Sequence, residues 1–287
     1  MTQFHRWWRH AKLGKRILAV ATVLIASICA IAVVWSLMGI IVQRVEITQA
    51  QDRQEQLTQS YDFDPGDIIS DGQFFNAHAM SQAEVQAFLD EHGAQCSGTQ
   101  CLKTRTFDTE NRNADQYCEA YEGAQGETAA AIIDKAARAC HVSQKVLLTM
   151  LQKEQQLVTA TNPSDFQFKA AMGLSCPDDA SCDPAYAGFF NQVLGSARRY
   201  QYYVAHESQY GYHAGQLNYI QYHPNTSCGG TDVYIENKAT ALLYIYTPYQ
   251  PNTASLAAGA GEGDSCSSYG NRNFSIIYQG WFGNARS

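Results

Sequence analysis

The first 45 residues contain no acidic side chain, and the stretch from Ile17 to Val42 contains no charged residue at all. This uncharged run of about 26 residues is long enough to cross a bilayer. A secretory signal has a shorter apolar region that ends at a small-residue cleavage site. We therefore expect an uncleaved membrane anchor, with cleavage near Ala50 as the alternative. Five basic residues lie within the first 16, which favours a cytoplasmic N-terminus and an extracytoplasmic C-terminal part.

Basic side chains are scarce in the rest of the chain. Beyond residue 42 there are 15 Lys and Arg against 27 Asp and Glu, a net charge of about −12. Proteins that bind nucleic acids present basic surfaces, so this composition excludes a nucleic-acid partner. No cofactor is expected either.

The cysteines lack CxxC spacing, and the histidines do not cluster with them, so no zinc site is expected. Cys29 lies inside the apolar run, and eight cysteines remain. An even number in an exported chain indicates disulfides, which disfavours a cysteine nucleophile. Eight cysteines allow many pairings, and the sequence leaves the connectivity open. Short loops favour Cys96–Cys101 and Cys176–Cys182, which leaves Cys118–Cys140 and Cys228–Cys266.

No period of 20–50 residues recurs, which excludes a repeat fold. Helical patterns dominate and alternating strand patterns are few, so we expect a mainly α fold with a minor β element. The expected organisation is a basic cytoplasmic tail (1–16), a transmembrane anchor (17–42), a stalk or helical extension (43–60) and an extracytoplasmic domain (61–287).

The best-defined helix begins at Ser81, which forms a capping box with Glu84. Met80 and Val85 supply the accompanying hydrophobic contact, and Gly93 suits the end of the helix. Further helices are expected at 128–140, 185–205, 237–246 and 274–282, with a hairpin within 206–236 and loops at 94–127 and 159–168.

The stretch Val142–Val158 repeats apolar residues at helical spacing, and Ser143 occupies the N-cap position. Glu154 lies on the same stripe as Leu147 and Val158. Most glutamates within helices are simply solvated, but this one is expected at the edge of the core or the floor of a cleft. Apolar surroundings disfavour the charged form of a carboxyl, and a general acid needs its proton at neutral pH.

Three segments carry a family resemblance. They are Leu147–Glu154 followed by Gln155, the turn Ala171-Met-Gly-Leu174, and Ala241–Pro248 continuing as Tyr246-Thr-Pro-Tyr-Gln-Pro-Asn252. In this order they resemble the lysozyme-like lytic transglycosylases of bacterial cell walls, and more closely an exported actinobacterial group of such domains. The resemblance covers roughly residues 60–285.

The resemblance implies a goose-type, transglycosylase-like helical domain that cleaves peptidoglycan glycan strands. Glu154 would be the general acid and Tyr244 would orient it or the substrate. Gln155, Met172, Gly173 and Tyr246 would bind substrate.

Cleaving a glycosidic bond needs a proton on the leaving oxygen and stabilisation of a positively charged sugar. Asp165, Asp178 and Asp183 are candidate second carboxylates, but none lies in a recognisable motif. A one-glutamate mechanism is therefore expected, in which the sugar's N-acetyl group or 6-hydroxyl replaces the second residue. Asp178, Asp179 and Asp183 also lack the spacing of a calcium loop, and no metal is expected.

The alternative is a non-catalytic module that binds peptidoglycan or another carbohydrate, or acts in adhesion. Two departures from the transglycosylase pattern favour it, Gln155 where the family has Ser and Ile245 where it has Asn. The chain also has Ser175-Cys176 where the family has Gln.

Overall fold

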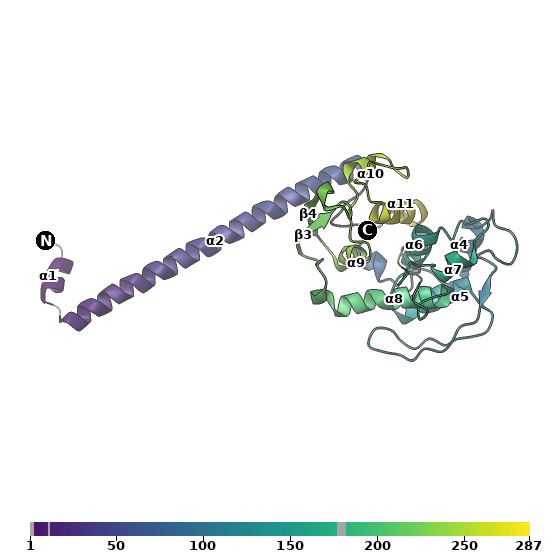
Figure 1. The fold of residues 1–287 in the computed structure, drawn as a ribbon. Helices are drawn as coiled ribbons and strands as arrows, with labels where there is room; N and C mark the ends of the chain where they lie inside the picture. The colour runs from purple at the N-terminus through teal and green to yellow at the C-terminus, as the bar shows by residue number, and fades with distance from the viewer. Residues whose placement is uncertain (1–2, 11, 177–181) are drawn as a thin grey trace. The chain divides into compact units, whose positions relative to one another are not determined.

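The computed structural model describes residues 3–10, 12–176 and 182–287 of the chain. The chain forms two compact units, Met1–Gln49 and Ala50–Ser287. The first unit holds α1 (Gln3–His10) and most of α2 (Leu13–Tyr61), which is one continuous helix in Figure 1. Helix α2 runs through residues 43–60, for which the sequence suggested a stalk or a helical extension, and the part of it from Ala50 belongs to the second unit.

Helix α2 is long and apolar enough to cross a membrane, judged by its length and composition. Its apolar side chains are exposed along the uncharged run, as at Trp35 and Ile41. Four disulfides accompany this helix, and together the two features indicate an exported or membrane-anchored protein. The orientation across the membrane stays a prediction.

The second unit is mainly helical, as expected. Its helices beyond α2 are α3 (Asp71–Phe74), α4 (Gln82–His92), α5 (Ala129–Ala139), α6 (Gln144–Gln155), α7 (Asp165–Lys169), α8 (Phe189–Ala205), α9 (Lys238–Tyr246), α10 (Thr253–Ala257) and α11 (Gly270–Phe282). Two antiparallel strand pairs accompany them, β1 (Thr106–Phe107) with β2 (Glu127–Thr128), and β3 (Gln216–Gln221) with β4 (Gly230–Ile235). The β3–β4 pair is the hairpin expected within 206–236. The lysozyme-like class of the fold stays a prediction.

Helices α5 and α6 form the centre of the core. Helix α5 packs against α4 and α8, and α6 packs against α5 and α11. In Figure 1 these helices gather at one end of the second unit, while the β3–β4 hairpin lies towards the other end beside α9. The apolar periodicity correctly predicted buried side chains in the two central helices, namely Ile132, Ile133, Ala136, Ala137, Val146, Leu147, Met150 and Leu151. Leu148, which it did not include, is fully buried as well.

Helix α4 forms as its sequence predicts. Ser81 accepts a hydrogen bond from the backbone N–H of Glu84, and the Glu84 carboxylate accepts one from the backbone N–H of Ser81. Gly93 ends the helix, and its N–H donates to the Leu89 carbonyl. The capping box and the end of the helix are both confirmed.

The helix that carries Glu154 is shorter than predicted. It ends at Gln155 because Gln156 adopts the left-handed conformation, with φ of 54°, so Val158 lies beyond it. Ser143 is the N-cap residue, but its side chain makes no capping hydrogen bond and its hydroxyl is buried without a partner among the described residues. The prediction that this hydroxyl satisfies backbone N–H groups is therefore wrong.

Three short helices were missed, namely α3, α7 and α10. Helix α7 lies in the segment 159–168 that was predicted to be a loop, and it begins with a capping box between Ser164 and Gln167. That signal was present in the sequence. Helix α10 lies in the Gly-rich tail, and the Asn252 side chain accepts a hydrogen bond from the Ser255 N–H at its start. Helix α8 begins at Phe189, later than predicted, after Gly188 with a positive φ of 98°.

The four expected disulfides are all present, and the pairing is the one favoured by loop length. Two of them hold the polar region between α4 and α5, where β1 and β2 also pair. Cys29 is free and exposed. The bonds join Cys96 to Cys101, Cys118 to Cys140, Cys176 to Cys182 and Cys228 to Cys266.

The end of α2 is built into the second unit through Gln54. Its side-chain Oε1 accepts a hydrogen bond from the Tyr234 N–H at 2.8 Å, and its Nε2 donates to the Tyr234 carbonyl at 3.2 Å. The same Nε2 donates to Asp64. The Gln54 amide therefore pairs with strand β4 much as a neighbouring strand would, and it covers part of the edge of the hairpin.

Candidate functional site

Glu154 stands where the buried helix α6 reaches the surface. Residues 146–151 of α6 are fully buried, whereas the Glu154 side chain is 23% exposed. The helix ends one residue later, so the carboxylate lies at its C-terminal end. A carboxylate there is disfavoured by the helix dipole, and the structure supplies a compensating cation.

That cation is Lys153, whose side chain is only 6% exposed. Its Nζ lies 2.8 Å from Oε1 of Glu154 and donates a hydrogen bond to Oγ1 of Thr247 at 3.0 Å. The same ammonium lies 5.7 Å from the centre of the Tyr246 ring. Sequence reasoning missed this arrangement because adjacent residues on a helix do not normally face each other.

The small-residue turn meets Glu154 at Gly173. A Cβ atom on Gly173 would lie 3.2 Å from Oε2 of Glu154 and 3.5 Å from its Cδ, so the backbone of the turn lies against the carboxylate. Gly173 has φ of +69°, a conformation that favours glycine. The sequence therefore needs glycine here both for the turn and for the close approach to Glu154.

The turn is fixed from its other side by Gln192 of α8, which is fully buried. Its Oε1 accepts hydrogen bonds from the N–H groups of Met172 and Leu174 at 3.0 and 3.1 Å. Its Nε2 donates to the carbonyls of Leu174 and Tyr186, each at 2.8 Å. No motif in the sequence identified Gln192 as a functional residue.

Tyr246 holds the same turn and lies near enough to Glu154 to feel its charge. Its hydroxyl donates a hydrogen bond to the Met172 carbonyl, and its ring stacks on Tyr200 at 5.5 Å. Burial raises the pKa of the Tyr246 hydroxyl, and the nearby Glu154 charge raises it further. Burial likewise raises the pKa of Tyr200, with smaller contributions from Tyr246 and Glu154. Both phenols therefore stay protonated at neutral pH and serve as neutral groups.

Tyr244 does not belong to the group of residues around Glu154. It is fully buried, its hydroxyl donates to the Pro65 carbonyl at 2.9 Å, and its ring packs near Tyr212. Within the described part of the chain no hydrogen bond joins Tyr244 to Glu154. Its hydroxyl is committed to the core, so the tyrosine that the structure brings to Glu154 is Tyr246, two residues later in α9.

Some of the other predicted site residues lie next to Glu154, and others have no interaction with it. Met172 is buried in the turn, and the Gln155 carbonyl accepts a hydrogen bond from the Gln167 side chain at 2.8 Å. Asp165 pairs with Arg105 at 3.0 Å and Asp183 accepts a hydrogen bond from the Ala185 N–H. Neither aspartate has an interaction with Glu154 among the described residues, and Asp178 and Asp179 lie outside them. Over residues 3–10, 12–176 and 182–287, no group of three or more His, Cys, Asp or Glu side chains could hold a metal ion.

Comparison with known proteins identifies a family over most of the chain. Residues 67–287 match the family described as LasA, N-terminal domain. No curated protein and no solved structure matches the chain. None of these comparisons supports the resemblance to lytic transglycosylases, which stays a prediction. Since the match covers most of the chain, including every element of the second unit from α3 onward, the chain belongs to the LasA N-terminal domain family.

Proposed function

We propose that the second unit cleaves the glycan strands of peptidoglycan, with Glu154 as the general acid on a lysozyme-like, transglycosylase-like domain. One observation carries the proposal. A partly exposed carboxylate stands at the end of a buried helix, against the glycine of a turn that is fixed from both sides. A general acid has to be held in this way, because proton transfer requires a defined position relative to the leaving oxygen.

The reaction needs only one carboxyl group from the protein. Glu154 gives its proton to the glycosidic oxygen as the bond from that oxygen to C1 breaks. The positive charge that develops on the sugar is met by the oxygen of its own N-acetyl group or by its 6-hydroxyl. The Glu154 carboxylate then takes the proton from the attacking 6-hydroxyl, or from water. The first outcome gives an anhydro sugar and the second gives a hydrolysed one.

The neighbours of Glu154 have distinct roles in this proposal. Lys153 stabilises the carboxylate that forms as the proton leaves. Tyr246 anchors the Met172 carbonyl and so keeps Gly173 against the acid. Tyr246 is thus a positioning residue, and it takes the place that the sequence suggested for Tyr244.

The second candidate function is a non-catalytic glycan-binding module, and the ion pair between Lys153 and Glu154 favours it. The pair presents Glu154 as a charged hydrogen-bond acceptor held 2.8 Å from a buried ammonium. Such an acceptor binds sugar hydroxyls without any need to transfer a proton.

The test uses the full-length protein in a non-ionic detergent with purified peptidoglycan. We expect wild type to release fragments and Glu154→Gln to lose about a hundredfold to ten-thousandfold in rate, since the amide is nearly isosteric but gives up no proton. The mass of the products distinguishes an anhydro end from a hydrolysed one. Asp165→Asn is the matched control, because Asp165 is an exposed, ion-paired carboxylate outside the site.

Co-sedimentation with insoluble peptidoglycan separates the two candidates. If Glu154→Gln digests as fast as wild type, Glu154 is not the acid. If wild type sediments with peptidoglycan without releasing fragments, and Glu154→Gln sediments less, the binding module is correct. If wild type neither binds nor cleaves, both proposals are wrong.

A further inference from the structure

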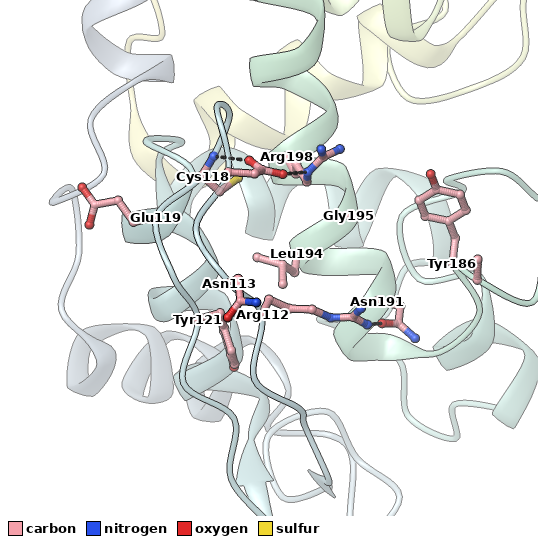
Figure 2. Close-up of a pocket in the computed structure, with 12 residues that line it drawn as sticks. Arg112, Asn113, Cys118, Glu119, Tyr121, Tyr186, Asn191, Leu194, Gly195 and Arg198 are labelled. Carbon is pink, nitrogen blue, oxygen red and sulfur yellow. Dashed lines mark hydrogen bonds and ion pairs between the residues drawn. The ribbon is translucent and has the colours of Figure 1, made fainter.

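A pocket of about 280 Å³ lies between the polar loop that precedes α5 and the first half of α8 (Figure 2). Its walls include Arg112 and Asn113 from the loop and Asn191, Gly195 and Arg198 from α8. None of the groups around Glu154 lines it. The pocket is therefore a second concave site, and it combines guanidinium and amide groups with an apolar floor.

The two arginines of the pocket retain unused donors. Among the described residues, Arg112 donates hydrogen bonds through Nη2 alone, which lies 2.5 Å from a Glu110 carboxylate oxygen and 3.0 Å from Oδ1 of Asn191. Arg198 lies over the Tyr117 ring and, among those residues, donates through Nε alone, to Asp115 at 2.6 Å. A guanidinium carries five N–H donors, so within the described part of the chain each arginine keeps several unpaired. Figure 2 shows Leu194 between these two guanidinium groups.

The acids near the pocket do not compete for those donors. Asp115 accepts hydrogen bonds from the N–H groups of Tyr117 and Cys118 as well as from Arg198. Burial raises the pKa of Asp115, but these three donors together hold it below its usual value. Asp115 therefore serves to fix Arg198. Glu119 is 73% exposed and points away from the pocket in Figure 2.

The balance of positive and negative side chains around the pocket determines how much negative charge a ligand can bring. Two guanidinium groups are offset by Asp115 at the wall and by Glu110 on Arg112, and the exposed Glu119 of the lining lies 3.6 Å from His141. A near-balanced site of this kind accepts one added negative charge more readily than two. The chemistry therefore fits a carboxylate better than a phosphate. The Asn113 amide, which makes no hydrogen bond among the described residues, suits a neighbouring peptide group.

The pocket adjoins the turn that touches Glu154. A Cβ atom on Gly195 would lie only 2.8 Å from Cδ2 of Leu174, so the wall of the pocket is in contact with the far side of that turn. Tyr186 lines the pocket, and its carbonyl accepts a hydrogen bond from the Gln192 side chain that also holds Met172. A ligand in the pocket and the Glu154 carboxylate thus lie on either side of one short, fixed segment.

We propose that this pocket binds a free carboxylate of a peptidoglycan peptide stem, with Arg112 and Arg198 as the groups that recognise it. The choice of polymer rests on the proposed function, whereas the preference for a carboxylate rests on the pocket alone. The ligand class is a short peptide on a muramic acid sugar with one free acid group. Recognition of the stem beside the glycan site would restrict the protein to strands that carry peptides.

The test is isothermal titration of the full-length protein in detergent with a muramoyl dipeptide that has one free carboxylate, and with its amidated counterpart. We expect the acid to bind at least about tenfold more tightly, since hydrogen bonds to charged groups are the stronger ones. Arg112→Gln and Arg198→Gln should each remove most of this difference. Arg105→Gln is the control, because Arg105 also pairs with an aspartate, Asp165, and does not line the pocket.

Equal binding of the acid and the amide by wild type overturns the proposal, as does the absence of binding to either. Stronger displacement of the acid by inorganic phosphate than by acetate would make the pocket a general anion site and would also overturn it. The acid–amide comparison needs no variant, so it stands even if Arg198→Gln fails to fold. Turnover of peptidoglycan is measured separately, so failure of the Glu154 proposal and failure of this one give different results.

Discussion

The contact between Gly173 and Glu154 gives the sharpest test of how the site is built. In Gly173→Ala, the new Cβ would lie 3.2 Å from Oε2 of Glu154, at a residue whose φ is +69°. The left-handed conformation costs an L-residue about 1–2 kcal/mol. The close contact also forces the carboxylate or the turn to move by a few tenths of an ångström. Both effects act on the same short segment.

For a domain of this size, a loss of about 1–2 kcal/mol lowers the Tm by roughly 2–8 °C. A displaced acid also loses rate, because misplacement by about 1 Å costs on the order of a hundredfold. A shift of a few tenths should therefore cost about tenfold in turnover of peptidoglycan. The assay combines thermal unfolding by circular dichroism with release of soluble fragments.

Gly215→Ala is the matched control. Gly215 also has a positive φ, +76°, but a Cβ there would have no neighbour within 4 Å. It should lose similar stability and keep full turnover, so the difference between the variants isolates the contact with Glu154. If the two variants behave alike in both measurements, the backbone of the turn does not position the acid and this reasoning fails.

Three further outcomes are expected. Tyr244→Phe should lower the free energy of unfolding by about 1–3 kcal/mol, because it leaves the buried Pro65 carbonyl without its donor, and should keep normal turnover; both are measured on the purified variant. Burial raises the pKa of Glu127, but its ion pair and hydrogen bonds more than offset this and hold it below its usual value of 4.5. Its stabilisation is therefore present at neutral pH and lost as pH falls below that value, so the Tm of wild type should fall more steeply than that of Glu127→Gln between about pH 5 and 3. Replacing Cys228 and Cys266 by alanine opens a loop with a sequence separation of 38 and should lower the free energy of unfolding by about 4 kcal/mol, measured by urea denaturation.

Each outcome has a clear contrary result. Loss of turnover in Tyr244→Phe at unchanged stability would mean that Tyr244 does act in the proposed site. Parallel pH profiles for wild type and Glu127→Gln would mean that another carboxylate sets the acid limit. A change of less than about 1 kcal/mol on opening the Cys228–Cys266 loop would mean that the denatured chain is already restricted there.

Helices with strong local signals were predictable from the sequence. The capping box at Ser81 and the apolar periodicity of α5 and α6 define their helices without tertiary help, and short loops favoured two of the four disulfides, Cys96–Cys101 and Cys176–Cys182. The end of α6 was not predictable. The left-handed Gln156 is a residue type with no preference for that conformation, so tertiary packing decides where the helix stops.

The site was predictable in part. Glu154, Met172, Gly173 and Tyr246 do lie together, but the choice of Tyr244 over Tyr246 depended on which side of α9 faces α6. Tyr244 is buried and Tyr246 is partly buried, and their spacing alone does not distinguish them. Lys153 and Gln192 were missed for a related reason, since their roles come from contacts with segments distant in the chain.

The pairing of Gln54 with strand β4 limits the positions at which the domain could be cleaved from a membrane anchor and stay intact. Proteolysis between Gln54 and Tyr61 would remove the amide that covers Tyr234 and would leave a strand edge open to association with other chains. Cleavage ahead of Ala50 would leave that pairing intact. A soluble form produced by processing near Ala50 would therefore keep this edge of β4 covered, whereas one trimmed by a dozen further residues would expose it and would be prone to aggregate.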